Sequence, residues 1–89
     1  MAEDNFKIKA DIYKALGHKS RLRILKELSD SENGLQPLFL AQILKIGIPS
    51  LYFHLDMLMK NKLIKAKKIK EKTFYYINPK MDTFIKERI

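Results

Sequence analysis

The feature that most constrains the fold is a pair of apolar helical segments separated by a very short turn. The first covers about residues 37–44 and the second about 49–61, with Gly47 in the turn between them. Proline is favoured in the first turn of a helix, and Pro37 stands where the first segment would begin. Two helices joined by a short turn that contains glycine predict a helix-turn-helix, here at about residues 37–61.

The second of these helices has a clear apolar face and an outer side with an aromatic ring. Three leucines recur at the i, i+4 and i+7 spacing of one helix face: Leu51, Leu55 and Leu58. Ser50 and Phe53 point away from this face, and Tyr52 and His54 lie on its flanks. The outer side of a surface helix is usually charged, so an outward phenylalanine suggests that another molecule contacts this side.

The sequence LIKAKKIKEKTFYYI, which follows, predicts a β-hairpin at about residues 63–77. Its apolar residues alternate with polar ones in the period of two that is typical of strands: Ile64, Ala66, Phe74 and Tyr76. The turn falls near Lys70 and Glu71, with neither glycine nor asparagine to indicate its geometry. A hairpin directly after a helix-turn-helix predicts a wing, and Leu35 is expected to start a further short strand.

The first helix, at about residues 5–16, has two apolar stripes. Ile8, Ile12, Ala15 and Leu16 form one stripe, and Phe6, Ala10 and Tyr13 form another, nearly opposite. A surface helix needs only one such stripe. One stripe is therefore expected on the core and the other on a second subunit; the alternative is that the same chain covers both.

Two further helices complete the predicted fold. One runs from a cap at Ser20 to about Ser29, and the last runs from Lys80 to Arg88 after an Asn78–Pro79 cap. The last helix has a single apolar stripe, which consists of Met81, Phe84, Ile85 and Ile89. The expected fold class is mainly α with a small β-hairpin, a winged helix-turn-helix that occupies residues 1–89 as one domain.

Length and composition exclude several classes of protein. A chain of 89 residues allows one domain, and because it buries only about 60–65% of its unfolded surface, a dimer would add stability. The absence of cysteine excludes disulfides, thiolate metal sites and redox switches. No apolar run is long enough to span a membrane, and the N-terminal sequence lacks the pattern of a signal peptide. A cytoplasmic protein is the expectation.

Positive charge is concentrated in one segment. Residues 60–72 hold seven lysines and one glutamate, a net charge of +6 out of +8 for the chain. The first 59 residues are close to neutral. A run of like charge is usually only a solvated face, but beside a helix with an outward aromatic it is better interpreted as a binding surface for a polyanion.

Three stretches together resemble the ArsR-type winged-helix repressors. IYKALGHKSRLRILKEL (12–28) is similar to the opening of that family, and IGIPSLYFHLDML (46–58) is similar to its recognition helix. NKLIKAKKIKEKTFYYI (61–77) resembles the wing, with a double tyrosine on the returning strand. The resemblance covers roughly residues 8–78. It implies a homodimer that binds an operator and represses transcription, with dimer contacts through the first and last helices.

The sequence departs from that family at several positions. The region of the third helix, LQPLFLAQIL (35–44), contains none of the cysteines found in metal-sensing members. On the last helix, no histidine follows Asp82. Both familiar metal sites are therefore missing. Tyr52 stands where serine is usual, Ile48 where a polar residue is frequent, and Asp56 where a basic residue is common.

The expected site residues form three sets. The recognition-helix set, expected to contact DNA, is Pro49, Ser50, Tyr52, Phe53 and His54. The wing set, expected to follow phosphates or the minor groove, is Lys67, Lys68, Lys70 and Lys72. The dimer set is Phe6, Ala10, Tyr13, Met81, Phe84 and Ile85. No catalytic residue, metal ligand or cofactor is expected, and the sequence does not indicate whether an effector exists.

Individual residues leave alternatives open. Phe53 is expected against a thymine methyl, but it could instead pack on the preceding turn or on the wing. His54 is bracketed by core positions, where a structural role is more common than a phosphate contact. Arg21 is expected to pair internally or to snorkel, His18 to form a helix corner, and Tyr76 to have a packing role.

Two classes of function remain beside a sequence-specific repressor that binds double-stranded DNA. A winged-helix interaction module, such as an antirepressor or adaptor, would dock through Ile48, Phe53 and Met57. Binding to nucleic acid without sequence preference is a weaker alternative. An enzyme is not expected, because two histidines 36 positions apart, with no cysteine and no glycine-rich phosphate loop, provide no catalytic set.

Overall fold

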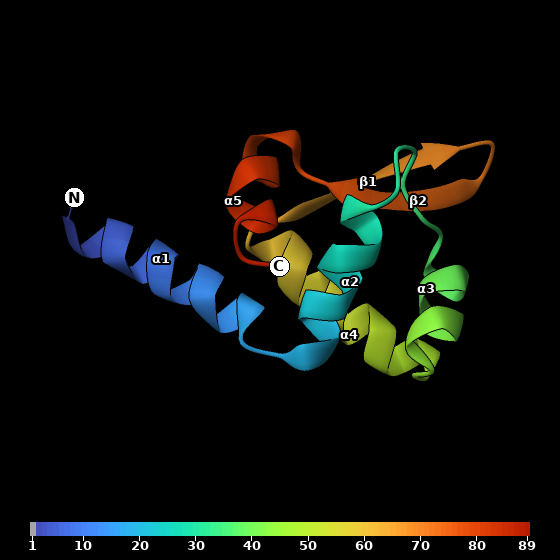
Figure 1. The fold of residues 1–89 in the computed structure, drawn as a ribbon, viewed down its shortest axis with the longest axis horizontal. Coiled ribbons are helices and arrows are strands. Elements are labelled where there is room, and N and C mark those ends of the chain that lie inside the picture. The colour runs from blue at the N-terminus through green and yellow to red at the C-terminus, as the bar shows by residue number, and fades with distance from the viewer. Residues whose placement is uncertain (1) are drawn as a thin grey trace.

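The computed structural model describes residues 2–89 and has the predicted order of elements (Figure 1). Four helices come first: α1 (Ala2–Leu16), α2 (Lys19–Ser29), α3 (Pro37–Leu44) and α4 (Ile48–Lys60). The hairpin strands β1 (Ile64–Ile69) and β2 (Lys72–Ile77) follow, and a 3-10 turn η1 (Pro79–Met81) leads into α5 (Asp82–Lys86). The predicted fold class, a mainly α winged helix-turn-helix with a small hairpin, is confirmed.

The core is built around the inner faces of α2, α3 and α4. Leu51, Leu55 and Leu58 of α4 are completely buried, which confirms that the leucines anchor this helix. They lie in one cluster with residues of the other helices and of the hairpin base, among them Ile24, Leu25, Leu28, Leu40, Leu44, Ile64 and Ile85. The position of α4 is therefore fixed by apolar burial, at about 1.5–3 kcal/mol for each fully buried leucine.

The turn between α3 and α4 has the geometry of a helix-turn-helix. The two helices are bent by 111° relative to each other, within the usual range of this motif. Lys45 ends α3 in the left-handed conformation, with φ of 57°, and donates its N–H to the carbonyl of Ala41. Gly47 is the N-cap of α4. No single helix within residues 2–89 is long and apolar enough to cross a membrane; α3 and α4 reach that length only together, across the bend.

The hairpin turn lies at Lys70 and Glu71, as predicted, and fixes which side chains face the core. Both residues have positive φ, 47° and 69°, as in the two-residue turns that suit the twist of a hairpin. The resulting register pairs Ile64 with Ile77 and Ala66 with Tyr75. Tyr75, rather than Tyr76, therefore packs against the core. The expected packing role of Tyr76 is wrong because this register places it on the outer face.

A single β-bridge connects the loop before α3 to the hairpin. The backbone of Leu35 pairs with that of Tyr75 through hydrogen bonds of 2.9 and 2.8 Å, so the expected short strand is one bridge long. Gly34 makes this approach possible, because its φ is +85° and an added Cβ would lie 2.7 Å from the carbonyl oxygen of Tyr75. A side chain at position 34 would push the loop away from the wing.

Several element boundaries differ from the predicted ones. The cap of α2 is His18, whose Nδ1 accepts a hydrogen bond from the N–H of Ser20 at 3.1 Å, and not Ser20 itself. The last helix is shorter than predicted, because the Asn78 side chain caps a 3-10 turn before α5 begins. The first helix begins earlier, at Ala2, and Figure 1 shows it projecting from the rest of the molecule.

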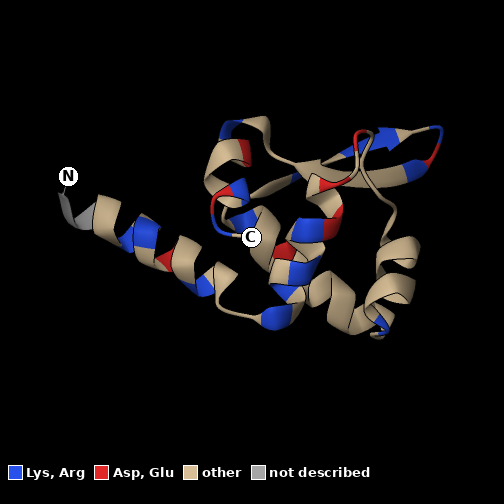
Figure 2. Cartoon of the chain, in the orientation of Figure 1, with Lys and Arg blue, Asp and Glu red and all other residues tan. Residues whose placement is uncertain are grey.

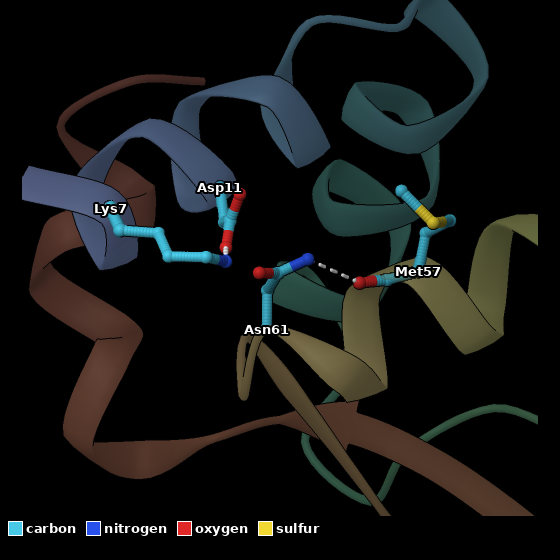
Figure 3. Close-up of polar contacts among 4 residues, drawn as sticks. All are labelled: Lys7, Asp11, Met57 and Asn61. Atoms are coloured by element: carbon cyan, nitrogen blue, oxygen red, sulfur yellow. Dashed lines mark hydrogen bonds and ion pairs between the residues drawn. The ribbon is translucent and has the colours of Figure 1, made fainter. Parts of the chain in front are cut away.

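The end of α4 lies near α1. The side-chain amide of Asn61 donates to the carbonyl of Met57 at 2.9 Å, and α1 passes nearby with the ion pair of Lys7 and Asp11 (Figure 3). The hydrogen bond from Lys7, followed by the charges of Lys7, Lys14 and Lys60, lowers the pKa of the Asp11 carboxyl. Because Lys60 belongs to α4, the last turn of α4 is an electrostatic neighbour of Asp11 in α1.

Candidate nucleic-acid interface

The outer side of α4 is open to solvent. Pro49 and Ser50 in its first turn are exposed, and so are Tyr52 and Phe53, at 41% and 59%. Gly47 offers no side-chain hydrogen bond to the helix start, and no acidic residue lies in the first turn. The N–H groups there and the positive end of the helix dipole are suited to an anion such as a phosphate.

Phe53 does not pack on the core. Its ring lies edge-on to that of His54, with centroids 5.5 Å apart, and more than half of the side chain remains exposed. An exposed aromatic residue of this size is able to contact an apolar group such as the methyl of thymine.

His54 faces the interior, and this corrects its expected place in the DNA-contacting set. Its side chain is only 5% exposed, and its Nδ1 lies 3.3 Å from an Nη of Arg21. Its ring also contacts that of His18 at a tilt of 49°, with centroids 4.5 Å apart. Burial, followed by the electrostatic influence of His18 and Arg21, lowers the pKa of His54. His54 follows Leu51 by three positions, so its side chain lies on the same inward side of the helix as the leucines. It helps to anchor α4 and does not face the DNA.

Arg21 pairs internally, as predicted. Its Nε donates to the carbonyl of Ala15 at 2.7 Å and an Nη donates to that of Lys14 at 3.4 Å. The guanidinium therefore joins the end of α1 to the inner side of α4 through His54. Sequence reasoning missed this cluster because His54 and Arg21 lie 33 positions apart; the only signal was two polar residues at core positions.

The wing is basic on both faces. Figure 2 shows the lysines along the hairpin, and those of the predicted set are exposed: Lys67, Lys68, Lys70 and Lys72. The register places Lys67 and Lys72 on the outer face together with Lys65, whereas Lys68 points to the other face and Lys70 lies in the turn. Within the described residues, no wing lysine takes part in an ion pair.

The wing and the outer side of α4 adjoin. Burial raises the pKa of Tyr75 on β2, and the neighbouring Tyr52 and Asp56 of α4 raise it further. On the outer face of the hairpin, the ammonium of Lys67 lies 5.3 Å from the centre of the Tyr76 ring. An aromatic helix surface and a lysine-bearing hairpin are thus held next to each other by the core.

The expected dimer set is only partly available at the surface. Phe6 is 68% exposed and Tyr13 is 53% exposed, Ala10 is exposed, and Met81 and Phe84 are half-buried. Ile85 is completely buried in the core of its own chain, because the short α5 turns it inward. It is therefore removed from the set.

Part of the first helix is covered by its own chain. The rings of Tyr13 and Phe84 lie 6.3 Å apart, and the guanidinium of Arg88 lies 3.7 Å from the Phe84 ring centre. The end of α1 thus contacts its own chain, but Tyr13 stays about as exposed as Phe6 and Ile8.

A comparison with known proteins identifies the class. No protein-family model matches the chain. An uncharacterised HTH-type transcriptional regulator of Methanocaldococcus jannaschii is 40% identical over 81 residues, which cover 90% of this chain and 85% of the relative. The chain belongs to the helix-turn-helix transcriptional regulators, and its fold is the winged form. Its relatives are DNA-binding regulators and not enzymes.

Solved structures of regulators share its fold over nearly the whole chain. HlyU of Vibrio cholerae is 26% identical, with 97% of this chain and 92% of HlyU covered and a TM-score of 0.82. The transcriptional repressor PagR of Bacillus anthracis is 27% identical, with 98% and 99% covered and a TM-score of 0.80. A homodimeric winged helix-turn-helix DNA-binding domain of Mycobacterium bovis, at 19% identity, shares the fold over 93% of this chain and 75% of that domain, with a TM-score of 0.83.

Proposed function

We propose that this regulator is a homodimeric repressor that binds a specific sequence of double-stranded DNA. The observation that carries the proposal is the outer side of α4, which is exposed and uncharged apart from Asp56 before its last turn and lies beside a wing with five lysines. PagR, which the chain resembles over almost its whole length, is described as a transcriptional repressor.

The outer side of α4 would enter the major groove, which is wide enough for a helix. Ser50, in the first turn, would receive a phosphate at the positive end of the helix. Tyr52 would donate a hydrogen bond to a base edge or phosphate, Phe53 would contact a thymine methyl, and Pro49 would lie at the point of entry. These contacts would determine which DNA sequence the protein prefers.

The wing would supply affinity. Lys67 and Lys72 on the outer face, Lys70 in the turn and Lys68 on the other face would lie along phosphates or the minor groove. Contacts to phosphate position a protein on the duplex and make binding depend on salt, but they carry no sequence information.

The second subunit would bind through α1 and the segment that contains η1 and α5. Phe6, Ala10 and Tyr13, with Met81 and Phe84, form the proposed dimer face, and the uncovered Phe6 and Ile8 would be buried there. A dimer of this kind reads two half-sites about one helical turn, or about 34 Å, apart.

We further propose that residues 1–89 act as one domain, with the helix-turn-helix at about 37–61 and the wing at about 63–77, and that it works in the cytoplasm, where it would reach the chromosome. Neither metal nor thiol sensing is part of the proposal. The 89 residues include no cysteine, and the described residues include no group of three or more potential metal ligands.

A selection from random oligonucleotides, with sedimentation of the free protein, tests the proposal. The expected result is a pseudo-palindromic consensus bound by a dimer, with affinity that falls steeply between low and moderate salt. A selection without any preferred sequence, or a monomer that binds single half-sites only, would contradict it.

One observation favours a second candidate, a module that docks on another protein. Leu38 and Phe39 of α3 are exposed by 61% and 50%, and Ile48 and Phe53 of α4 are exposed as well, so the helix-turn-helix carries several exposed apolar side chains. Exposed apolar residues in this number often mark a protein contact. Salt separates the two functions, because apolar docking would persist at salt concentrations that release DNA.

A further inference from the structure

A cavity lies outside the proposed DNA surface, at the corner between α1 and α2. Its volume is about 500 Å3, and it is bounded by residues 16–19 of the corner, by one side of α2, and by residues 88 and 89. Small-molecule sites in proteins are commonly of this size. Nothing in the proposed reading of DNA uses this cavity.

The lining of the cavity combines an apolar floor with a cationic rim. Leu16, Leu22 and Ile89 form the floor, and four cationic side chains surround it: Lys19, Arg23, Lys26 and Arg88. No acidic residue is among the lining residues in the described part of the chain. Lys26 is paired with Asp30 at 3.4 Å, and Arg88 lies 3.9 Å from Glu87. Neither Lys19 nor Arg23 forms an ion pair with any residue whose side chain is described.

The local backbone adds to this positive potential. Helix α2 begins at the rim with Lys19 and has no acidic residue in its first turn. The positive end of its dipole therefore lies at the edge of the same space as the rim cations. A neutral apolar ligand would leave this potential unused, and a small inorganic anion would leave the floor uncovered.

We propose that the cavity binds an amphipathic organic anion, a carboxylate with a short hydrocarbon body. The hydrocarbon would cover Leu16 and Leu22, and the carboxylate would accept hydrogen bonds from Lys19 and Arg23. Charge-assisted hydrogen bonds of this kind are stronger than neutral ones, and arginine suits a carboxylate because its N–H groups form a planar fork.

The site is connected to the DNA-binding helix and to the proposed dimer face. The ring of His18, which lines the cavity, contacts that of the buried His54 of α4, with centroids 4.5 Å apart. Arg88, also in the lining, lies 3.7 Å from the ring centre of Phe84 and 6.0 Å from that of Tyr13. The ligand is therefore an effector that changes DNA affinity, and this part of the inference rests on the proposed function.

Binding is tested on the full chain by nuclear magnetic resonance titration with octanoate, octanol and inorganic phosphate. Octanoate should shift the amide signals of residues 16–26. Octanol and phosphate should bind at least about tenfold more weakly than octanoate, because octanol lacks the carboxylate and phosphate lacks the hydrocarbon. The double variant K19Q/R23Q should lose about tenfold or more in octanoate affinity. The control K60Q/K62Q, with the same change of charge at exposed positions outside the cavity, should bind octanoate as the original protein does.

Three results would overturn the site: no octanoate binding, equal binding of octanol, or signal shifts centred on the exposed stripe of α1. The regulatory part has its own readout, the affinity for the selected operator at saturating octanoate, which should change by at least about fivefold in the original protein and not in K19Q/R23Q. An unchanged affinity would overturn the effector role. Failure of the proposed function itself would be recognised separately, as absence of a preferred operator without any ligand.

Discussion

Helix α4 and the wing lie side by side, but they differ in what holds them in place and in how much charge they carry. Helix α4 is anchored by three completely buried leucines, and residues 36–59 contain only two charged side chains, Lys45 and Asp56. The wing is held by strand pairing and by its buried base at Ile64 and Ile77, and residues 64–77 contain five lysines and one glutamate.

The difference separates two properties of binding that many proteins combine in one helix. The outer side of α4 can distinguish sequences but offers little charge, whereas the wing offers charge but reads few bases. Stability should therefore depend on the inside of α4, affinity on the wing, and sequence preference on the outside of α4. Each of these assignments can be tested by a substitution.

The largest effect is expected from the inner side of α4. Leu55→Ala removes a fully buried side chain and leaves a cavity, so the free energy of unfolding should fall by about 2–5 kcal/mol. Ile69→Ala on the wing, where the side chain is 48% exposed, should change it by less than about 0.5 kcal/mol. Urea unfolding measures both. Equal losses would show that the wing, too, is held by burial of its apolar residues.

The next effect concerns the charges of the wing. The variant K67Q/K68Q/K70Q/K72Q removes four lysines from each subunit of the proposed dimer, so it should reduce the steepness of the plot of log affinity against log salt by up to about 7.2, at about 0.9 for each phosphate that a lysine no longer neutralises. The selected consensus should stay the same, because phosphate contacts do not read sequence. Fluorescence anisotropy at several salt concentrations measures the change. A changed consensus would assign base reading to the wing.

A smaller effect, on sequence preference, is expected from the outer side of α4. Phe53→Ala should weaken binding to the selected operator by about 1–3 kcal/mol and relax preference at one base pair of each half-site. The salt dependence should not change, since no charge is removed. Met59→Ala, an exposed residue near the other end of the same helix, is the matched control. If Phe53→Ala weakens binding to all sequences equally, the residue does not read a base.

The two regions also differ in how much of them the sequence could predict. The spacing of the leucines was enough to predict the anchored face of α4, because a helix puts residues i, i+4 and i+7 on one side. The faces of the hairpin could not be predicted with equal certainty. A shift of one residue exchanges the two faces, and the turn at Lys70 and Glu71 has positive φ at two residues that do not favour it. For this reason Tyr76 was expected where Tyr75 packs.

Contacts between distant residues were beyond sequence reasoning altogether. Periodicity placed Arg21 among apolar neighbours and His54 between core positions, but it could not show that they meet each other and His18. The position of Ile85 was missed for a related reason. The stripe of the last helix was predicted from one long helix, whereas α5 is short and turns Ile85 into the core.

The smallest effect tests the inner side of α4 by its response to pH. His54 has a lowered pKa in the folded protein, caused by burial and then by His18 and Arg21, compared with 6.5 for an ordinary histidine. The unfolded chain therefore takes up the proton first as pH falls. The contribution of the buried neutral ring is fully present above about pH 6.5 and is lost progressively below it, by at most about 1.4 kcal/mol for each pH unit. Urea unfolding at pH 7.5 and 5.5 should show the loss in the original protein and a smaller loss in His54→Gln, which cannot take up a proton. An equal loss in both would place the titration elsewhere, and the inner side of α4 would then be held by its leucines alone.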